Sequence, residues 1–290
     1  MKLCRYDNDR LGLIKGDEVL DVTAALDLLP AVRWPLPMGD LLIANLDKII
    51  ARVRELEPGA AKKPVSAVRF KSPVANPTKI VNAPINYHAH IDEAEKDQGI
   101  AHGREIKNKN IWDWGLFLKA NSALIGFGEE IVLRWPDRRN DHEIELAVII
   151  GKTCNKVKKE DALDYVAGYA MGLDMTIRGP ELPSFRKSVD TYAVCGPWLI
   201  TKDEVANPNK LNLSIKVNGE ARQSSNTDKL VYDVHKLIEY ASSFYTLHPG
   251  DIIFTGTPEG VGPVKPGDVL SCEIESVGKA DIRVAADYAG

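Results

Sequence analysis

The stretch "DHEIELAVIIG" (residues 141–151) decides the fold, because its apolar second half predicts a buried strand. Its first half carries two glutamates, Glu143 and Glu145, which stand two residues apart. Alternate side chains of a strand point to the same face, so the two carboxylates share one face. A strand that begins in solvent would explain the pair as exposed charges, since glutamate is rarely buried unless it is paired.

A second apolar run, "GYAMGLDMTIRG" (residues 168–179), contains one more acid, Asp174. Three carboxylates at the ends of two apolar strands are costly to bury without a cation. Oxygen ligands alone suit a hard divalent ion, Mg²⁺, Mn²⁺ or Ca²⁺, whereas zinc favours histidine or cysteine close by. The pattern therefore predicts a metal site formed by Glu143, Glu145 and Asp174.

The stretch "NYHAHIDEAEK" (residues 86–96) predicts a helix over residues 88–97 that carries a candidate general base. His90 and Glu93 are three residues apart, so their side chains can touch on that helix. A carboxylate beside an imidazole fixes its tautomer and raises its basicity, which suits proton abstraction. The alternative is a solvated helix start with scattered polar groups.

Two further groups could act on an anionic substrate. Lys187 precedes an apolar run, and near a metal its ammonium could stabilise an enolate or a carboxylate, although an exposed lysine is the ordinary case. The Gly/Pro-rich loop over residues 256–268 could hold a carboxylate through main-chain N–H groups and Thr257. A tight turn explains this loop equally well, and the nucleotide-binding pattern GxxxxGK[ST] is missing from it.

The composition places the chain among ordinary globular proteins. Its 290 residues suffice for a large domain with or without a small one, and the formal net charge of -4 favours neither nucleic acid nor anionic membrane as a partner. We find no secretory signal at the N-terminus and no apolar run of membrane-spanning length. Four scattered cysteines indicate reduced, buried thiols in a cytoplasmic protein. They are Cys4, Cys154, Cys195 and Cys272.

The order of expected elements predicts an α+β fold that is mostly β, with a small N-terminal domain (1–70) and a catalytic domain (71–290). The N-terminal part should hold a hairpin that turns at residues 15–17 and a helix capped by Asp40. Residues 60–79 are polar and rich in proline, as in a linker. Asn218-Gly219 predicts a further hairpin turn.

The remaining elements follow from apolar periodicity. Besides the helix at residues 88–97, helices are expected over residues 159–166 and 232–244. Strands are expected over residues 79–81, 131–133, 143–150, 168–174, 193–201, 211–217, 252–255 and 269–274.

Six blocks in this order resemble the fumarylacetoacetate hydrolase family, over residues 79–286. Single blocks are weak signals, whereas six in the family's order are specific. They are "NYHAHIDE", "FLKANSALIGFGEEI", "DHEIELAVIIG", "GLDMTIR", "KSVDTYAVCGPW" and "PGDIIFTGTPEGVGP". The resemblance implies a mixed β-roll of the family type, usually dimeric, with the small N-terminal domain of its longer members.

The resemblance also implies roles for single residues. The three acids would bind Mg²⁺ or Mn²⁺, with Ca²⁺ as a further candidate, and Lys187 would lie beside the metal. His90 and Glu93 would activate water. Thr257 would bind a substrate carboxylate, and the substrate site would include Arg178, Tyr87 and Gly256.

The implied reaction is the metal-dependent hydrolysis of a 2,4-diketo acid, an acylpyruvate such as fumarylpyruvate or maleylpyruvate in aromatic catabolism. Water attacks the distal carbonyl, and the bond breaks to pyruvate, which leaves as its enolate, and a carboxylic acid. The same site could instead decarboxylate oxaloacetate-like acids, or hydrate or isomerise unsaturated 2-keto acids. A non-catalytic binding protein is the third hypothesis. The expected partners are a small keto acid and a second copy of the chain, with no nucleic acid and no membrane.

Some positions depart from the family pattern. Leu173, Gly179 and Ala120 stand where many members have Asn, Asp and Pro, respectively. Residues 94–115 form a segment longer than in compact members, which we expect to contribute to a lid over the substrate. The identity of the acid half of the substrate should depend on this segment.

Overall fold

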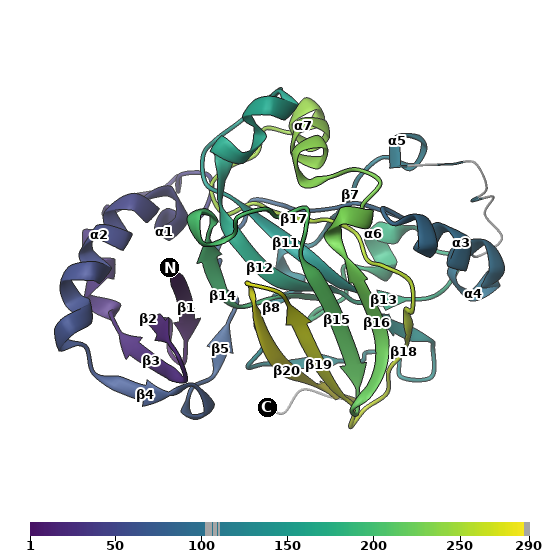
Figure 1. Cartoon of the computed structure of the whole chain (residues 1–290), viewed down its shortest axis with the longest axis horizontal. Coiled ribbons are helices and arrows are strands. Elements are labelled where there is room, and N and C mark those ends of the chain that lie inside the picture. Colours follow the sequence, from purple (N-terminus) through teal and green to yellow (C-terminus); the bar gives the residue numbers. More distant parts are fainter. Residues whose placement is uncertain (102–105, 107–108, 110, 287–290) are drawn as a thin grey trace.

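The computed structural model describes residues 1–101, 106, 109 and 111–286. These residues fold into three sheets, of 12, 3 and 5 strands, with helices at both ends of the molecule (Figure 1). Strands clearly outweigh helices, which confirms the predicted α+β class with a mostly β composition.

The largest sheet runs through the middle of the molecule and joins segments far apart in sequence. Ten of its strands follow one path, in the order β4 (Lys62–Pro64), β3 (Glu18–Asp21), β2 (Arg10–Lys15), β1 (Lys2–Tyr6), β14 (Ala193–Thr201), β12 (Val166–Asp174), β11 (Ile144–Ile150), β17 (Ile252–Phe254), β6 (Ile80–Asn82) and β7 (Phe117–Lys119). Two short strands lie off this path, β5 (Phe70–Lys71) beside β1 and β8 (Leu124–Ile125) beside β14.

The five-stranded sheet packs against one face of the larger sheet, and the three-stranded sheet adjoins the ends of β11 and β12. The five-stranded sheet has the order β16 (Glu220–Asn226), β15 (Asn212–Val217), β19 (Val269–Ile274), β20 (Gly278–Ala285) and β9 (Glu130–Val132). The three-stranded sheet has the order β13 (Thr176–Ile177), β10 (Asn140–His142) and β18 (Gly262–Pro263). The predicted Asn218-Gly219 hairpin is present between β15 and β16, where Val217 pairs with Glu220.

Helices and 3₁₀ turns are distributed along the described chain, between the strands. The α-helices are α1 (Leu41–Ala44), α2 (Leu46–Leu56), α3 (His88–Lys96), α4 (Gln98–Ala101), α5 (Ile111–Trp114), α6 (Pro183–Arg186) and α7 (Val234–Phe244). The 3₁₀ turns are η1 (Thr23–Leu28), η2 (Glu57–Gly59), η3 (Val65–Ala67), η4 (Asn121–Ala123), η5 (Lys159–Tyr165), η6 (Lys202–Glu204) and η7 (Thr227–Lys229). The helix predicted over residues 159–166 is therefore a 3₁₀ turn.

The structure confirms some of the predictions for the N-terminal segment and contradicts others. Asp40 caps α1 by accepting hydrogen bonds from the main-chain N–H groups of Leu42 (3.0 Å) and Ile43 (3.2 Å). The predicted linker over residues 60–79 is wrong in detail, because it contributes strands β4 and β5 to the large sheet. Strand β1 pairs with β14, so this sheet continues across the predicted boundary at residue 70. The division into two domains stays a prediction.

Strand β11 is buried on both faces, which explains its uninterrupted apolar run. Leu146, Val148 and Ile150 pack into a core shared with the five-stranded sheet. Ala147 and Ile149 pack into a second core on the other face. Each large apolar side chain buried in this way contributes about 1.5–3 kcal/mol to folding.

The predicted strand over residues 143–150 begins one residue later than expected. Strand β10 ends at His142 and pairs within the three-stranded sheet, whereas β11 starts at Ile144 and belongs to the large sheet. Glu143 lies at the junction between the two sheets. The junction places the Glu143 carboxylate at the end of the large sheet.

Candidate active site

Three carboxylates meet where β11 and β12 bring their acidic residues together. One oxygen from each of Glu143, Glu145 and Asp174 lies within 4.8 Å of the others, and each residue is at most 4% exposed. Asp174 ends β12, and Glu145 of β11 pairs with Gly172 of β12, where an added Cβ would meet the ring of Phe254 at 2.7 Å. Burial raises the pKa of Glu145 well above its usual value, and the charges of Asp174 and Glu143 raise it further. A buried, all-oxygen, mutually repelling set of ligands fits a hard divalent cation.

Lys187 follows α6 and binds two of these acids directly. Its Nζ lies 2.7 Å from Glu143 Oε2 and 2.6 Å from Asp174 Oδ2. Burial lowers the pKa of Lys187, but the charges of Asp174 and Glu143 outweigh burial and leave it above the usual value. The ammonium therefore stays protonated beside the carboxylate cluster.

Arg178 follows β13 and supports Glu143 from the other side. Its Nη2 donates to Glu143 Oε1 (2.8 Å) and its Nε to Asp141 Oδ2 (2.8 Å). Asp141 also accepts a hydrogen bond from Arg139 at 2.8 Å, so the ion pairs continue from Arg178 through Asp141 to Arg139. Burial acts to raise the pKa of Glu143, but Lys187 and Arg178 bring it below its usual range. Glu143 is thus held ionised as a candidate ligand.

The predicted pair on α3 is in hydrogen-bond contact. His90 Nδ1 lies 2.8 Å from Glu93 Oε2, and the second oxygen of Glu93 accepts from the main-chain N–H of Gly260 at 2.9 Å. Because an ionised carboxylate only accepts hydrogen bonds, this contact favours the tautomer in which Nδ1 donates to Glu93 and Nε2 faces away from it. His90 is 5% exposed and lines the same cavity as the three acids.

The loop after β17 contacts the last two residues of the "EIE" stretch, Ile144 and Glu145. The Gly256 N–H donates to Glu145 Oε2 at 2.5 Å, and its φ of +96° favours glycine at this position. The Thr257 hydroxyl donates to the carbonyl oxygen of Ile144 at 2.9 Å, and Thr257 lines the cavity. Gly256 is absent from the described lining and acts here through Glu145.

Tyr87, which the resemblance implies for the substrate site, lies buried next to α3. The residue is 1% exposed, and its hydroxyl is buried without a hydrogen-bond partner among the described residues. Burial and the charge of Glu145 raise its pKa. Tyr87 is also absent from the described lining of the cavity.

The cavity has a volume of about 100 Å³ and brings acidic, basic and apolar side chains together. It is lined by Ala83, Pro84, Ile85, His90, Ile100, Ala101, Ile106, Trp114, Phe117, Glu143, Glu145, Asp174, Arg178, Pro183, Arg186, Lys187 and Thr257. Four of these, from Ile100 to Trp114, belong to the longer segment over residues 94–115. Trp112 is 62% exposed and packs on Tyr240, with ring centroids 4.9 Å apart. His102 and Arg104 lie outside the described residues.

Sequence reasoning gave no role to several polar residues at the site. Lys119 on β7 is buried, and its ammonium contacts Asp174 Oδ1 and the Met175 carbonyl (3.2 Å). Burial lowers the pKa of Lys119, against the attraction of Asp174. Arg186 lines the cavity, and Gln223 binds Thr257 from β16. The signal for Lys119 was its place as a single charge in "FLKA", inside a block that resembles the family.

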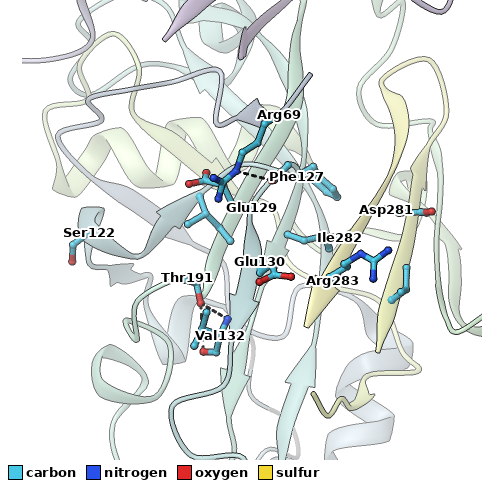
Figure 2. A pocket seen from close by; sticks show the side chains of 13 residues that line it. Arg69, Ser122, Phe127, Glu129, Glu130, Val132, Thr191, Asp281, Ile282 and Arg283 are labelled. Atoms are coloured by element: carbon cyan, nitrogen blue, oxygen red, sulfur yellow. Dashed lines mark hydrogen bonds between the residues drawn. The ribbon is translucent and has the colours of Figure 1, made fainter. Parts of the chain in front are cut away.

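A second hollow, of about 610 Å³, lies away from these carboxylates. Figure 2 shows it lined by β20 side chains such as Ile282 and Arg283, with Glu130 from β9 and Arg69 nearby. It mixes both signs of charge and contains none of the candidate catalytic residues. The candidate catalytic residues therefore lie in the smaller cavity.

The chain belongs to the fumarylacetoacetate hydrolase family, because residues 79–285 match the family model described as fumarylacetoacetate (FAA) hydrolase C-terminal. This confirms the family expected from the sequence. The chain is 54% identical to maleylpyruvate hydrolase of Aquipseudomonas alcaligenes over 284 residues, covering 98% of this chain and 99% of the relative. It is 39% identical to a mitochondrial oxaloacetate tautomerase of Bos taurus, covering 92% and 85% of the two chains.

Similar solved structures support the same family assignment. The fold matches maleylpyruvate hydrolase from Sphingobium sp. SYK-6 in complex with manganese(II) and pyruvate, with a TM-score of 0.83 at 40% identity. The match covers 99% of this chain and 100% of the other. The predicted family fold is therefore confirmed over the part of the chain that this match covers.

Proposed function

We propose that the chain is a divalent-metal-dependent hydrolase that cleaves the C–C bond of an acylpyruvate, such as maleylpyruvate or fumarylpyruvate, to pyruvate and a carboxylic acid. The observation that carries this proposal is that three buried carboxylates share a cavity with a histidine whose Nδ1 is fixed by a glutamate. Hydrolysis of a 2,4-diketo acid needs a cation that stabilises negative charge on the keto acid and a base that removes a proton from water. The 54% identity to a maleylpyruvate hydrolase supports the same reaction class.

The metal we infer is Mn²⁺ or Mg²⁺, with Ca²⁺ as a weaker fit to so small a set of protein ligands. Glu143, Glu145 and Asp174 would hold it, and the manganese in the similar Sphingobium structure supports this assignment. When bound, the ion supplies Lewis-acid stabilisation to the negative charge that develops on the keto acid.

His90 acts as the general base through Nε2. Glu93 fixes the imidazole by accepting from Nδ1, and Gly260 in turn fixes Glu93, so the base is oriented before substrate arrives. Proton removal from water by Nε2 produces an imidazolium, which the Glu93 carboxylate stabilises.

Lys187 and Thr257 act on the pyruvate half. The Lys187 ammonium, already protonated beside Glu143 and Asp174, stabilises the enolate charge as the C–C bond breaks. The Thr257 hydroxyl lines the cavity and, by turning away from the Ile144 carbonyl, would donate to the substrate carboxylate. Arg178 contributes by keeping Glu143 ionised and oriented. We infer no direct substrate contact for Tyr87.

The deciding experiment is a product balance. Purified protein with Mn²⁺ is incubated separately with maleylpyruvate, fumarylpyruvate and oxaloacetate, and pyruvate, the cleaved dicarboxylic acid and CO₂ are quantified. We expect equal amounts of pyruvate and cleaved acid from an acylpyruvate. Pyruvate and CO₂ from oxaloacetate without any acylpyruvate cleavage would overturn the proposal in favour of a decarboxylase.

A second candidate is enol–keto interconversion of oxaloacetate, which the similarity to a mitochondrial oxaloacetate tautomerase favours. That reaction needs proton transfer at carbon but no attacking water. It is tested by following the enol absorbance of oxaloacetate in the same preparation. Catalysed loss of the enol without hydrolysis of either acylpyruvate would favour this candidate.

We further infer a cytoplasmic homodimer. Trp135 and Phe185 stack with ring centroids 5.8 Å apart and are 45% and 49% exposed, and Leu182 nearby in sequence is 69% exposed. Such exposed apolar side chains favour a protein interface. Light scattering coupled to gel filtration tests the dimer.

The proposed cytoplasmic location is supported by the four buried free thiols, which suit a reducing compartment. Among the described residues, no helix is long and apolar enough to cross a membrane.

A further inference from the structure

We propose that the indole N–H of Trp114 donates a hydrogen bond to the distal carbonyl oxygen of the substrate and stabilises the negative charge that forms there when water adds. This inference rests on the proposed hydrolase function and deepens it by naming a further catalytic residue of the same site. It concerns the reacting carbonyl, which every acylpyruvate carries, and not the terminal group of the acyl chain.

Trp114 is held in place on the wall of the catalytic cavity. It is the last residue of α5 and lines the cavity together with His90 and the three acids. Its side chain packs against the apolar cluster of Ala94, Ala101 and Ile106. The Nζ atom of Lys109 lies over the ring, 5.5 Å from its centroid. Apolar packing and a cation over its face favour one orientation of the indole, so its N–H group is placed before substrate arrives.

The indole nitrogen of Trp114 has no acceptor in the protein. Its Nε1 is buried, and it lacks a hydrogen-bond partner in the part of the chain that the structure describes. A buried indole N–H usually finds a partner, because an unpaired buried donor loses its hydrogen bond to water and gains nothing in return. An acceptor on a bound ligand accounts for such a donor on the wall of a cavity.

The other side-chain donors of the described lining already have acceptors within the protein. Each contacts a carboxylate or a main-chain carbonyl oxygen. They are His90, Arg178, Arg186, Lys187 and Thr257. Trp114 thus differs from them in meeting no protein acceptor among the described residues.

The proposed reaction places charge on an atom for which the other residues supply no donor. His90 Nε2 takes a proton from water, the water oxygen bonds to the distal carbonyl carbon, and the π electron pair of that carbonyl moves onto its oxygen. When this pair forms the C=O bond again, the C–C bond breaks and its electrons pass to the pyruvate half as the enolate. Lys187 and Thr257 serve the pyruvate half, whereas Trp114 serves the distal oxygen.

This hydrogen bond acts on the rate more than on substrate binding. A hydrogen bond strengthens when its acceptor becomes charged, so the indole N–H binds an oxyanion more strongly than a carbonyl oxygen. An interaction that is stronger in the transition state raises kcat and leaves KM nearly unchanged. Loss of one such donor lowers kcat by about 100- to 1000-fold in other hydrolases.

The kinetic test uses Trp114→Phe, which keeps an aromatic ring and removes the N–H. We expect kcat for maleylpyruvate to fall about 100-fold while KM stays within about threefold. Fumarylpyruvate should lose the same factor, because its reacting carbonyl is the same and only the geometry of its acyl chain differs. A loss confined to one of the two substrates would place the N–H on the acyl chain, and an unchanged kcat on both would leave it without a role. Either result overturns the inference.

A second variant separates the N–H group from the shape of the ring. In 3-benzothienylalanine a sulfur atom replaces the indole N–H and the bicyclic ring is kept. Protein with this residue at position 114 should lose kcat as Trp114→Phe does, because sulfur offers no hydrogen. Wild-type kcat in this protein would show that ring shape alone suffices and would overturn the inference.

A binding test is independent of turnover. The first probe is 3-(methylphosphinato)-2-oxopropanoate, in which a tetrahedral, anionic phosphorus group replaces the distal carbonyl of acetylpyruvate. The second probe is 2-oxopentanoate, which has a methylene group at that position. In calorimetric titration of Mn²⁺-loaded protein, Trp114→Phe should weaken the phosphinate about 30-fold and 2-oxopentanoate less than about twofold.

The two probes also separate this inference from the proposed function. Equal effects of Trp114→Phe on both probes would overturn the inference even if maleylpyruvate is hydrolysed. A selective loss of phosphinate binding in a protein that hydrolyses neither acylpyruvate would refute the proposed function alone.

The matched control is Trp112→Phe, on the same short helix. Trp112 is 62% exposed, stacks on Tyr240 and is absent from the described lining of the cavity. The variant tests whether loosening α5 suffices to slow the reaction. We expect kcat and the affinity for the phosphinate to stay within about twofold of wild type. A loss like that of Trp114→Phe would contradict a direct role of the Trp114 N–H.

Discussion

The main-chain N–H of Asp174 donates a hydrogen bond of 2.9 Å to the carbonyl oxygen of Glu143. This bond joins the end of β12 to the junction between β10 and β11, so the two carboxylates leave neighbouring segments at the same end of the sheet. Lys187 then binds both side chains at once. The metal site thus depends on the register of two strands as much as on the acids themselves.

The first prediction concerns Glu145→Gln. In metal-free protein, this neutral isostere removes the repulsion from Glu143 and Asp174, so we expect an unchanged or higher Tm. With Mn²⁺ added, wild-type protein should gain Tm in proportion to ligand binding, and the variant should gain little. Thermal scans with and without Mn²⁺ measure both effects.

The control is Glu220→Gln, an exposed glutamate on β16 that pairs only with Arg222 among the contacts described. It should keep the full Mn²⁺-dependent gain in Tm. A full gain in Glu145→Gln as well would remove Glu145 from the ligand set.

The sequence predicted those parts of the site that come from local patterns. Glu143 and Glu145 were found by strand periodicity, and His90 with Glu93 by helix spacing. The structure brings each pair together. Both patterns lie within four residues, where backbone geometry alone decides which side chains meet.

The residues that the sequence did not predict reach the site over long distances in the chain. Lys119 meets Asp174 from 55 positions away, and Gln223 meets His142 from 81 positions away. No local period marks such contacts, because sheet order decides them. Strands β4 and β5 were not predicted for a similar reason. Each is only two or three residues long, and β4 contains Pro64, so neither shows the alternation that identifies a strand.

The second prediction concerns the general base. His90→Ala removes the lone pair that accepts the water proton, so kcat for acylpyruvate hydrolysis should fall by about 100-fold or more. The three acids are untouched, so the affinity for Mn²⁺ should change by less than about threefold. Steady-state kinetics and calorimetric titration of Mn²⁺ test the two statements. The neighbouring His88, which is exposed, gives the control His88→Ala, expected to retain activity. Unchanged hydrolysis in His90→Ala would require another base.

The third prediction concerns the four thiols. All four cysteines are free and buried, and burial raises the pKa of Cys4 and Cys195 to about 12 and that of Cys154 to about 11. A raised pKa keeps the thiol protonated and unreactive until the pH approaches that value. We expect the native protein to release almost no thionitrobenzoate from Ellman's reagent at mildly alkaline pH. Unfolded protein should release four equivalents, and rapid release by native protein would contradict the burial.

The last prediction concerns Gln223, whose buried amide connects three segments of the site. Its Nε2 donates to Thr257 Oγ1 (2.8 Å) and to the Pro258 carbonyl (2.7 Å). Its Oε1 accepts from the Ile144 N–H at 3.1 Å and lies 3.1 Å from His142 Nδ1. One side chain therefore ties the substrate loop to the strand that carries the acids.

Gln223→Leu should act on both stability and substrate binding. It leaves the Ile144 N–H and other buried polar groups without their partner, at about 1–3 kcal/mol for each group, so the free energy of unfolding should fall by several kcal/mol. It also frees the Thr257 hydroxyl, so KM for the acylpyruvate should rise more than kcat falls, because His90 and the three acids keep their contacts. Urea unfolding and steady-state kinetics measure the two effects. Ser224→Val, an exposed substitution one residue along β16, should change neither, and a Gln223→Leu protein with normal stability and KM would show that the amide does not position Thr257.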